Sequence, residues 1–179
     1  MIELAQQFMP YLFTFVLAAA IAEIILSARW SPLYFTCGIT ILQRNITIKS
    51  TATRLPDAAQ IEAALPPCGR KAPMLVHRIT DDRLACREKL FHPGIGYSPV
   101  MRGLITRDPV SGEIRVRGLL NWYILLFSSS FLFFICISPP DPANIIIPLC
   151  MLVLLAYIYW MQSRRYREVE DAVQKLLTE

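Results

Sequence analysis

Three long apolar segments constrain this 179-residue chain more than any other feature. They cover residues 8–28, 119–137 and 145–161, and the only charged residue within them is Glu23. A helix needs about 20 mainly apolar residues to cross the hydrocarbon layer of a bilayer. The segments lack the alternation of polar and apolar residues that is typical of membrane barrel strands. We therefore expect three transmembrane helices.

The N-terminal segment is expected to remain in the protein as a membrane helix. A cleavable signal peptide begins with basic residues, and residues 1–7 contain neither Lys nor Arg. With 54% apolar residues and a mean hydropathy of +0.41, the chain has more apolar side chains than one small soluble core needs.

The distribution of cations predicts the orientation. Fourteen of the eighteen Lys and Arg residues lie between Arg29 and Arg117, and the other four follow the last apolar segment. Cytoplasmic segments of membrane proteins are enriched in Lys and Arg. We therefore expect a multi-pass protein of the plasma (inner) membrane, with the N-terminus outside and the middle domain and C-terminus in the cytoplasm.

The apolar segments and this orientation together divide the chain into four expected parts. They are a transmembrane helix (1–30), a basic β-rich cytoplasmic domain (31–117), a transmembrane hairpin (118–161) and an amphipathic cytoplasmic tail helix (162–179). The fold class is a membrane α-helical protein with three transmembrane helices and an inserted small β-rich (α+β) domain.

Short strands are expected in the middle domain, five to seven in number, with one helix over Leu55–Leu65. We predict two strands and a turn within Tyr34–Ile48, then strands over Met74–Ile79 and Leu84–Phe91. Val100–Arg107 and Glu113–Gly118 form the clearest hairpin. A small curled sheet or a partly open barrel fits this pattern.

The hairpin and tail continue the helical pattern. A tight turn is expected at Ser138–Pro142, with Asn144 as the N-cap of the last helix. Apolar residues in the tail recur at the spacing of an amphipathic helix: Val169, Ala172, Val173, Leu176 and Leu177. The tail is therefore expected to dock on the β-rich domain.

Glu23 is the first candidate functional residue, because carboxylates inside a membrane are costly and often functional. One interpretation is a proton or cation site, as in an accessory subunit of a transporter or channel. The other is a structural carboxyl group that bonds Ser27, Tyr123 or Tyr157 near the membrane boundary. Its isolated position near the helix end favours the structural interpretation.

Arginines next to the membrane segments are the second candidate set. Residues 29–117 carry fourteen cations and seven anions, a net charge of +7. Cations next to an anionic leaflet gain about 1 kcal/mol each. We expect headgroup contacts, unless these charges only set the orientation, from Arg29, Arg115, Arg117, Arg164 and Arg165.

Catalytic, metal and cofactor sites are not expected. The cysteines and histidines lack metal-ligand spacing, and no phosphate-binding loop is present. No aromatic and basic platform for nucleic acid is evident. The leading hypothesis is a non-enzymatic module that binds lipid headgroups or another membrane protein, or associates with itself. An accessory transporter or channel subunit is the alternative. An interfacial lipid-modifying enzyme using His92 or Glu23 has the least support.

Overall fold

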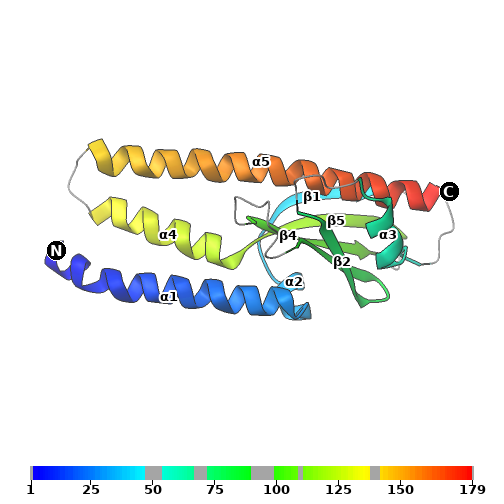
Figure 1. Ribbon diagram of the computed structural model, residues 1–179, viewed down its shortest axis with the longest axis horizontal. Helices are drawn as coiled ribbons and strands as arrows, with labels where there is room; N and C mark the ends of the chain where they lie inside the picture. The colour runs from blue at the N-terminus through cyan, green and yellow to red at the C-terminus, as the bar shows by residue number, and fades with distance from the viewer. Residues whose placement is uncertain are drawn as a thin grey trace.

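The computed structural model of this chain describes residues 2–46, 54–66, 72–89, 99–108, 111–137 and 142–178. Three long helices lie side by side, and a five-stranded sheet lies at one end of this group, where the C-terminal half of the last helix runs along it (Figure 1). In chain order the elements are α1 (Ile2–Ala28), α2 (Pro32–Thr36), β1 (Thr40–Ile46), α3 (Ala58–Ala64), β2 (Met74–Thr80), β3 (Arg83–Glu88), β4 (Met101–Arg107), β5 (Ile114–Leu120), α4 (Trp122–Ile137) and α5 (Pro142–Thr178). The chain is a mixed α+β protein.

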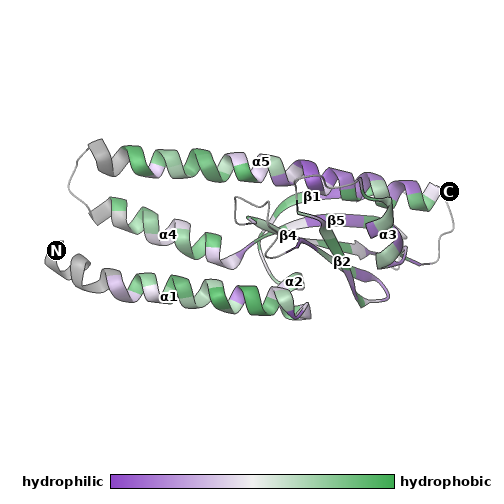
Figure 2. Cartoon of the chain, viewed as in Figure 1, coloured by the Kyte–Doolittle hydropathy of each residue, from purple (hydrophilic) through white to green (hydrophobic). Residues whose placement is uncertain are grey.

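Two helices are long and apolar enough to cross a membrane. They contain Pro10–Ala28 of α1 and Ile146–Thr178 of α5, whose most apolar windows have mean hydropathies of 2.1 and 1.8. Only 11% and 22% of these windows are buried inside the protein, and most residues of the two apolar stretches are hydrophobic (Figure 2). The remaining apolar segment, residues 119–137, begins in β5 and then forms α4, whose 16 residues are fewer than the usual membrane span. The structure thus supports two candidate spans by length and composition, where the sequence predicts three.

The sheet is antiparallel, with the strand order β1-β5-β4-β3-β2. Strands β2 to β5 form a meander, as the expected hairpins require. Gly112 has a φ of +71° in the turn between β4 and β5, a conformation that favours glycine. Strand β5 continues into α4 through the single residue Asn121.

The prediction of two strands within Tyr34–Ile48 is wrong. The chain instead forms helix α2, which begins at Pro32, and one strand, β1. Proline favours the first turn of a helix because its φ is already helical. The polar residues 43–45 do not interrupt β1, because they are exposed on an edge strand. The described part of the domain therefore has two short helices where the sequence predicts one. Ile48 lies outside the described residues.

Helix α3 lies within the expected range, and a capping box fixes its start. The Asp57 carboxylate accepts a hydrogen bond from the Ala58 N–H, and the Gln60 side chain accepts one from the Asp57 N–H. Glu62 of α3 accepts a 2.6 Å hydrogen bond from the Val76 N–H of β2. This edge strand is therefore partly capped by α3.

The main core lies between the sheet and the C-terminal half of α5. Tyr166, Val169 and Val173 of α5 pack with buried residues from every strand, and Leu176 and Leu177 extend the contact. The predicted docking of the tail is confirmed. Asn144 is not an N-cap, since α5 begins at Pro142, a favoured residue type in a first turn. Most of the expected turn at 138–142 lies outside the described residues.

Candidate functional site

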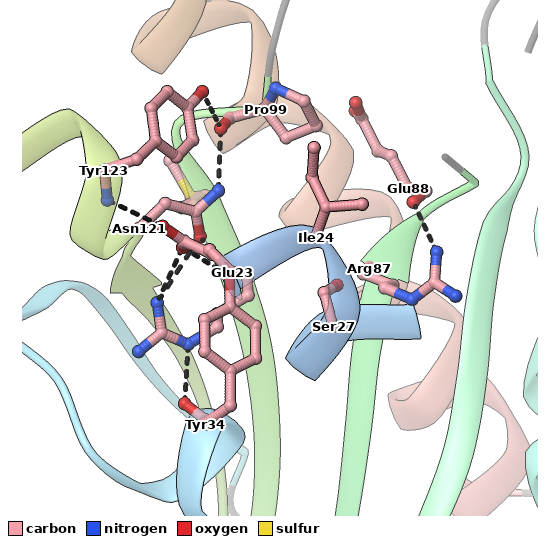
Figure 3. A pocket seen from close by; sticks show the side chains of 11 residues that line it. Glu23, Ile24, Ser27, Tyr34, Arg87, Glu88, Pro99, Asn121 and Tyr123 are labelled. Atoms are coloured by element: carbon pink, nitrogen blue, oxygen red, sulfur yellow. Dashed lines mark hydrogen bonds and ion pairs between the residues drawn. The ribbon is translucent and has the colours of Figure 1, made fainter. Parts of the chain in front are cut away.

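A buried polar cluster joins the helices to the sheet. It forms where α1 crosses the short connection from β5 to α4, with α2 and β4 alongside (Figure 3). We name this set the junction cluster: Glu23, Tyr34, Arg102 and Asn121. All four side chains are buried.

Glu23 of α1 caps the N-terminus of α4. Its two carboxylate oxygens accept hydrogen bonds from the backbone N–H groups of Trp122, at 3.0 Å, and Tyr123, at 2.6 Å. The first N–H groups of a helix have no partner within the helix, and the helix dipole favours an anion at this end. The Tyr34 hydroxyl donates a third hydrogen bond to Glu23 at 2.5 Å. The carboxylate is therefore well satisfied although it is only 4% exposed.

Arg102 of β4 provides the opposite charge, 3.7 Å from Glu23. It donates hydrogen bonds to the backbone oxygens of Tyr34 (2.8 Å), Cys37 (2.6 Å) and Leu120 (2.7 Å). Its guanidinium also lies 3.9 Å from the centre of the Tyr34 ring. A Cβ atom at Gly38 would lie 2.7 Å from this guanidinium, so a larger residue there would require Arg102 to shift. Arg102 of β4 thus links α1, the segment that contains α2, and the end of β5.

Burial and neighbouring charges shift the pKa values of Arg102 and Tyr34 in this cluster. Burial lowers the pKa of Arg102, although Tyr34 and Glu23 partly oppose that shift. Burial and the neighbouring Glu23 raise the pKa of Tyr34, so its hydroxyl remains a neutral donor. Tyr34 therefore donates to the carboxylate and does not act as a base.

Two amide side chains extend the network. Asn121 donates to the Pro99 oxygen at 2.7 Å and accepts from the Tyr34 hydroxyl at 3.3 Å. Gln162 of α5 accepts from the backbone N–H groups of Val100 and Met101, at 2.8 and 3.0 Å. Helices α1, α4 and α5 are therefore each bonded to the sheet or to the segments that flank it.

A small cavity of about 50 Å³ adjoins the cluster and is lined also by Ser27, Arg87 and Glu88. It has room for only a few water molecules. Cys86, in the main core on the other face of the sheet, is a poor nucleophile, because burial raises the pKa of its thiol to about 12. Among the described residues, no group of three His, Cys, Asp or Glu side chains could hold a metal ion. The geometry is that of a structural clamp.

The structure brings only part of the predicted intramembrane site together. Glu23 bonds the backbone of Tyr123, and Ser27 lines the same cavity. Tyr157 lies on the surface of α5, 56% exposed, with its ring 6.1 Å from that of Trp160. His92 lies outside the described residues.

The predicted headgroup arginines occupy different environments. Arg29 is exposed after α1, and Arg164 is exposed on α5 with its guanidinium 3.8 Å from the centre of the Trp160 ring. Arg165 is 4% exposed and donates to the Ala72 oxygen at 2.6 Å and to Glu168 at 3.0 Å, inside the protein. Arg115 and Arg117 are half-buried on β5.

The sheet has two chemically different faces. Ile114 and Val116 of β5 point toward the core beneath α5, so the alternating Arg115 and Arg117 point the other way. The cross-strand register places more side chains on that second face, which we name the arginine face: Gln43, Asn45, His77, Arg83, Ala85, Arg87, Arg102, Leu104 and Thr106. None of these positions is Asp or Glu.

The half of the arginine face nearest the helices is covered. Tyr34 and Phe35 of α2 pack on Ala85, and the Trp30 ring stacks on His77 at 5.0 Å. Trp30 has a φ of +52° at the end of α1, a conformation that an L-residue adopts at a cost. Its stacking therefore helps to hold α1 against the sheet.

The sequence analysis missed Tyr34, Arg102, Asn121 and Gln162. Arg102 was detectable in part, because it is the one charged residue among the apolar residues 99–105, and Glu23 is a lone anion in an apolar helix. Buried charges are usually paired, and that rule links the two.

The chain matches no protein family model, no curated protein and no solved structure.

Proposed function

We propose that this chain is a three-span protein of the plasma (inner) membrane, with its sheet and C-terminus in the cytoplasm. The apolar parts of α1, α4 and α5 extend in one direction from the sheet (Figure 1), and the C-terminal half of α5 packs against the sheet. Both ends of the α4–α5 hairpin therefore lie on the same side as the sheet. The short α4 is preceded by the apolar residues Leu119 and Leu120, and membranes adapt to short spans by local thinning.

Cysteine labelling in intact cells tests this topology. Asp81→Cys and Thr178→Cys, each in a background without native cysteines, should react with a membrane-impermeant thiol reagent only after lysis. Gln6→Cys, at the opposite end of the molecule, is the control that should react before lysis. Labelling of either of the first two variants in intact cells would contradict the proposed orientation.

The proposed function is non-enzymatic binding of anionic lipid headgroups where the helices meet the cytoplasm. The observation that supports it most is the Arg164–Trp160 pair, an exposed cation stacked on an aromatic ring at the end of the apolar part of α5. Tryptophan favours the membrane interface, and a neighbouring arginine gains from an anionic leaflet. Arg29 is a second exposed cation, at the end of α1.

Lipid binding is measured on the full chain in mild detergent by native mass spectrometry, with phosphatidylglycerol and phosphatidylcholine added together. Arg29→Gln/Arg164→Gln should weaken phosphatidylglycerol binding about thirtyfold, at about 1 kcal/mol for each cation. The control variant Arg44→Gln/Arg78→Gln removes the same charge from the sheet face opposite the arginine face, and should have little effect on lipid binding. Equal loss in both variants, or no preference for phosphatidylglycerol, would refute the function.

A groove between α1 and α4 favours a second candidate, an accessory subunit of a transporter or channel complex. The groove has a volume of about 460 Å³, and its lining is apolar apart from Ser130: Pro10, Leu12, Phe13, Val16, Phe127 and Phe131. The Ser130 hydroxyl donates to the Leu126 oxygen of its own helix at 2.7 Å. A partner membrane helix fits such a surface.

Affinity purification in mild detergent tests this second candidate. A partner that occupies the groove should be lost when Val16→Trp fills it, while Leu154→Trp, on the exposed surface of α5, should retain it. Recovery of the wild-type protein alone would count against the subunit hypothesis, and recovery of a homo-oligomer would indicate self-association.

A further inference from the structure

The uncovered half of the arginine face carries two cations that have no ion pair with a described carboxylate. Arg83 is exposed and Arg117 is half-buried, and neither has an ion pair with any described carboxylate. Arg115 does have partners, because Asp108 lies 3.6 Å from it and Glu113 3.4 Å. The Nε atom of Arg117 is buried without a hydrogen-bond partner. Two cations on this face therefore remain available to an outside anion.

We propose that this half of the arginine face binds an acidic segment of a partner protein. Arginine binds carboxylates through two parallel hydrogen bonds, which makes it suited to recognising Asp and Glu side chains. Next to Arg117 in the register lies Gln43, and next to Arg115 lies Asn45. These exposed amides can bond the backbone of a bound segment, so the surface matches a hydrophilic, negatively charged chain.

The spacing of the cations favours a chain over a single small anion. Arg83 lies two strands from β5, in the same cross-strand row as Arg115. Neighbouring strands are about 4.8 Å apart and successive rows on one face about 7 Å apart. The Cα atoms of Arg83 and Arg117 are therefore separated by about 12 Å, which two carboxylates of one extended peptide can bridge.

The direction of the strands disfavours a lipid surface as the occupant. Because β5 runs directly into α4, its residues move away from the helices at about 3.4 Å each. Arg115 therefore lies about 20 Å from the start of α4, while the headgroup layer is only about 5–8 Å thick. A flat membrane reaches the near rows at most, whereas a peptide can follow the whole face.

Nucleic acid fits this surface less well. Binding of single strands relies on aromatic side chains that stack with the bases. The described positions on the uncovered half include no aromatic residue, since they are Gln43, Asn45, Arg83, Thr106, Arg115 and Arg117, while Leu104 between them is buried. The nearest ring on the face, that of Trp30, is already stacked on His77. An acidic peptide is the occupant that these observations favour.

The test uses the full chain in nanodiscs of phosphatidylcholine, which present no anionic headgroup. A fluorescent eight-residue peptide of alternating Glu and Ser is titrated, and binding is followed by anisotropy. Its Kd should rise about tenfold in Arg83→Gln/Arg117→Gln, from the loss of two exposed charge pairs at low salt. The matched control, Arg44→Gln/Arg78→Gln on the opposite face, should stay within about twofold of wild type.

Three results would overturn the proposal. One is absence of binding to the wild-type protein, and another is an equal loss in both double variants. The third is tighter binding of phosphatidylglycerol or an oligonucleotide of equal charge that Arg83→Gln/Arg117→Gln abolishes, since either would then be the occupant. Thermal unfolding of each variant checks its folding. The inference requires the sheet to face an aqueous compartment but does not require Arg29 or Arg164, so failure of the headgroup proposal is distinguishable.

Discussion

Two groups of arginines on the same face of one sheet have opposite surroundings. Arg102 is 2% exposed and has a carboxylate, three backbone oxygens and two rings around it. Arg83 and Arg117, farther from the helices, have no described ion-pair partner. A buried charge requires compensation from the same chain, while an exposed charge is stabilised by water and can accept an external partner. The comparison separates a charge that holds the fold from charges that are available for binding.

The largest expected effect is on the junction cluster. Arg102→Met leaves the buried Glu23 carboxylate without its cation, and should lower the free energy of unfolding by about 3–5 kcal/mol. The measurement is chemical denaturation of the full chain in mild detergent. Adding Glu23→Gln to Arg102→Met should recover part of this loss, because the remaining charge is removed.

The proposed difference between Arg102 and the exposed arginines would be refuted if Arg102→Met were no more destabilising than a substitution at an exposed arginine. The pair would then be unimportant for stability despite its burial.

Tyr34→Phe should have the next largest effect. It removes the hydroxyl that donates to Glu23 at 2.5 Å but keeps the ring beneath Arg102. Hydrogen bonds to charged groups contribute about 1.5–3 kcal/mol, so a loss in this range is expected in the same denaturation experiment. Phe35→Leu, in the same helix but outside the hydrogen-bond network, is a control for packing alone.

A thiol buried in the main core, that of Cys86, gives a pH-dependent prediction. The pKa of Cys86 is about 12 in the folded protein, against an ordinary value of 9.0. Between these two values the unfolded chain releases a proton that the folded chain keeps, so stability falls as the pH rises, by about 1 kcal/mol at pH 10.

Comparison of stability at pH 8 and pH 10 in wild type and Cys86→Ala isolates this contribution. The variant should show the smaller decrease. In the folded protein at pH 8, maleimide should label the exposed Cys37 much faster than the buried Cys86. Equal labelling rates would mean that Cys86 is accessible and that its pKa is not raised by burial.

The smallest effect is expected on the uncovered half of the arginine face. Arg117→Gln removes a cation that has no described ion-pair partner, so the free energy of unfolding should change by less than about 0.5 kcal/mol. A loss close to that of Arg102→Met would show that Arg117 also supports the fold, and would weaken its assignment to a binding surface.

Much of the architecture could be predicted from the sequence because local patterns determine it. The period-two pattern of β5 and the proline-rich breaks located the hairpins, and the helical spacing of Val169, Val173 and Leu177 predicted the docked tail. Region 34–48 was misassigned because β-branched and aromatic residues suggested strand, whereas Pro32 and packing of Tyr34 and Phe35 produced a helix. Tertiary contacts overrode propensity there.

The junction cluster was harder to predict, because its members come from distant parts of the chain. Glu23 and Arg102 meet only after the sheet has formed and α1 has crossed its end. Sequence spacing carries no information on such a contact. Burial of one lone charge predicts that a partner exists, but not which residue provides it.

The docking of α5 also constrains the order in which the protein can mature. Ribosomes synthesise the strands first, yet the apolar surface of the sheet is covered by Tyr166, Val169 and Val173 of α5, which are made only after β1 to β5. Until α5 has been made, the nascent strands expose that surface to their surroundings. A chain truncated before residue 162 would retain the exposed surface permanently.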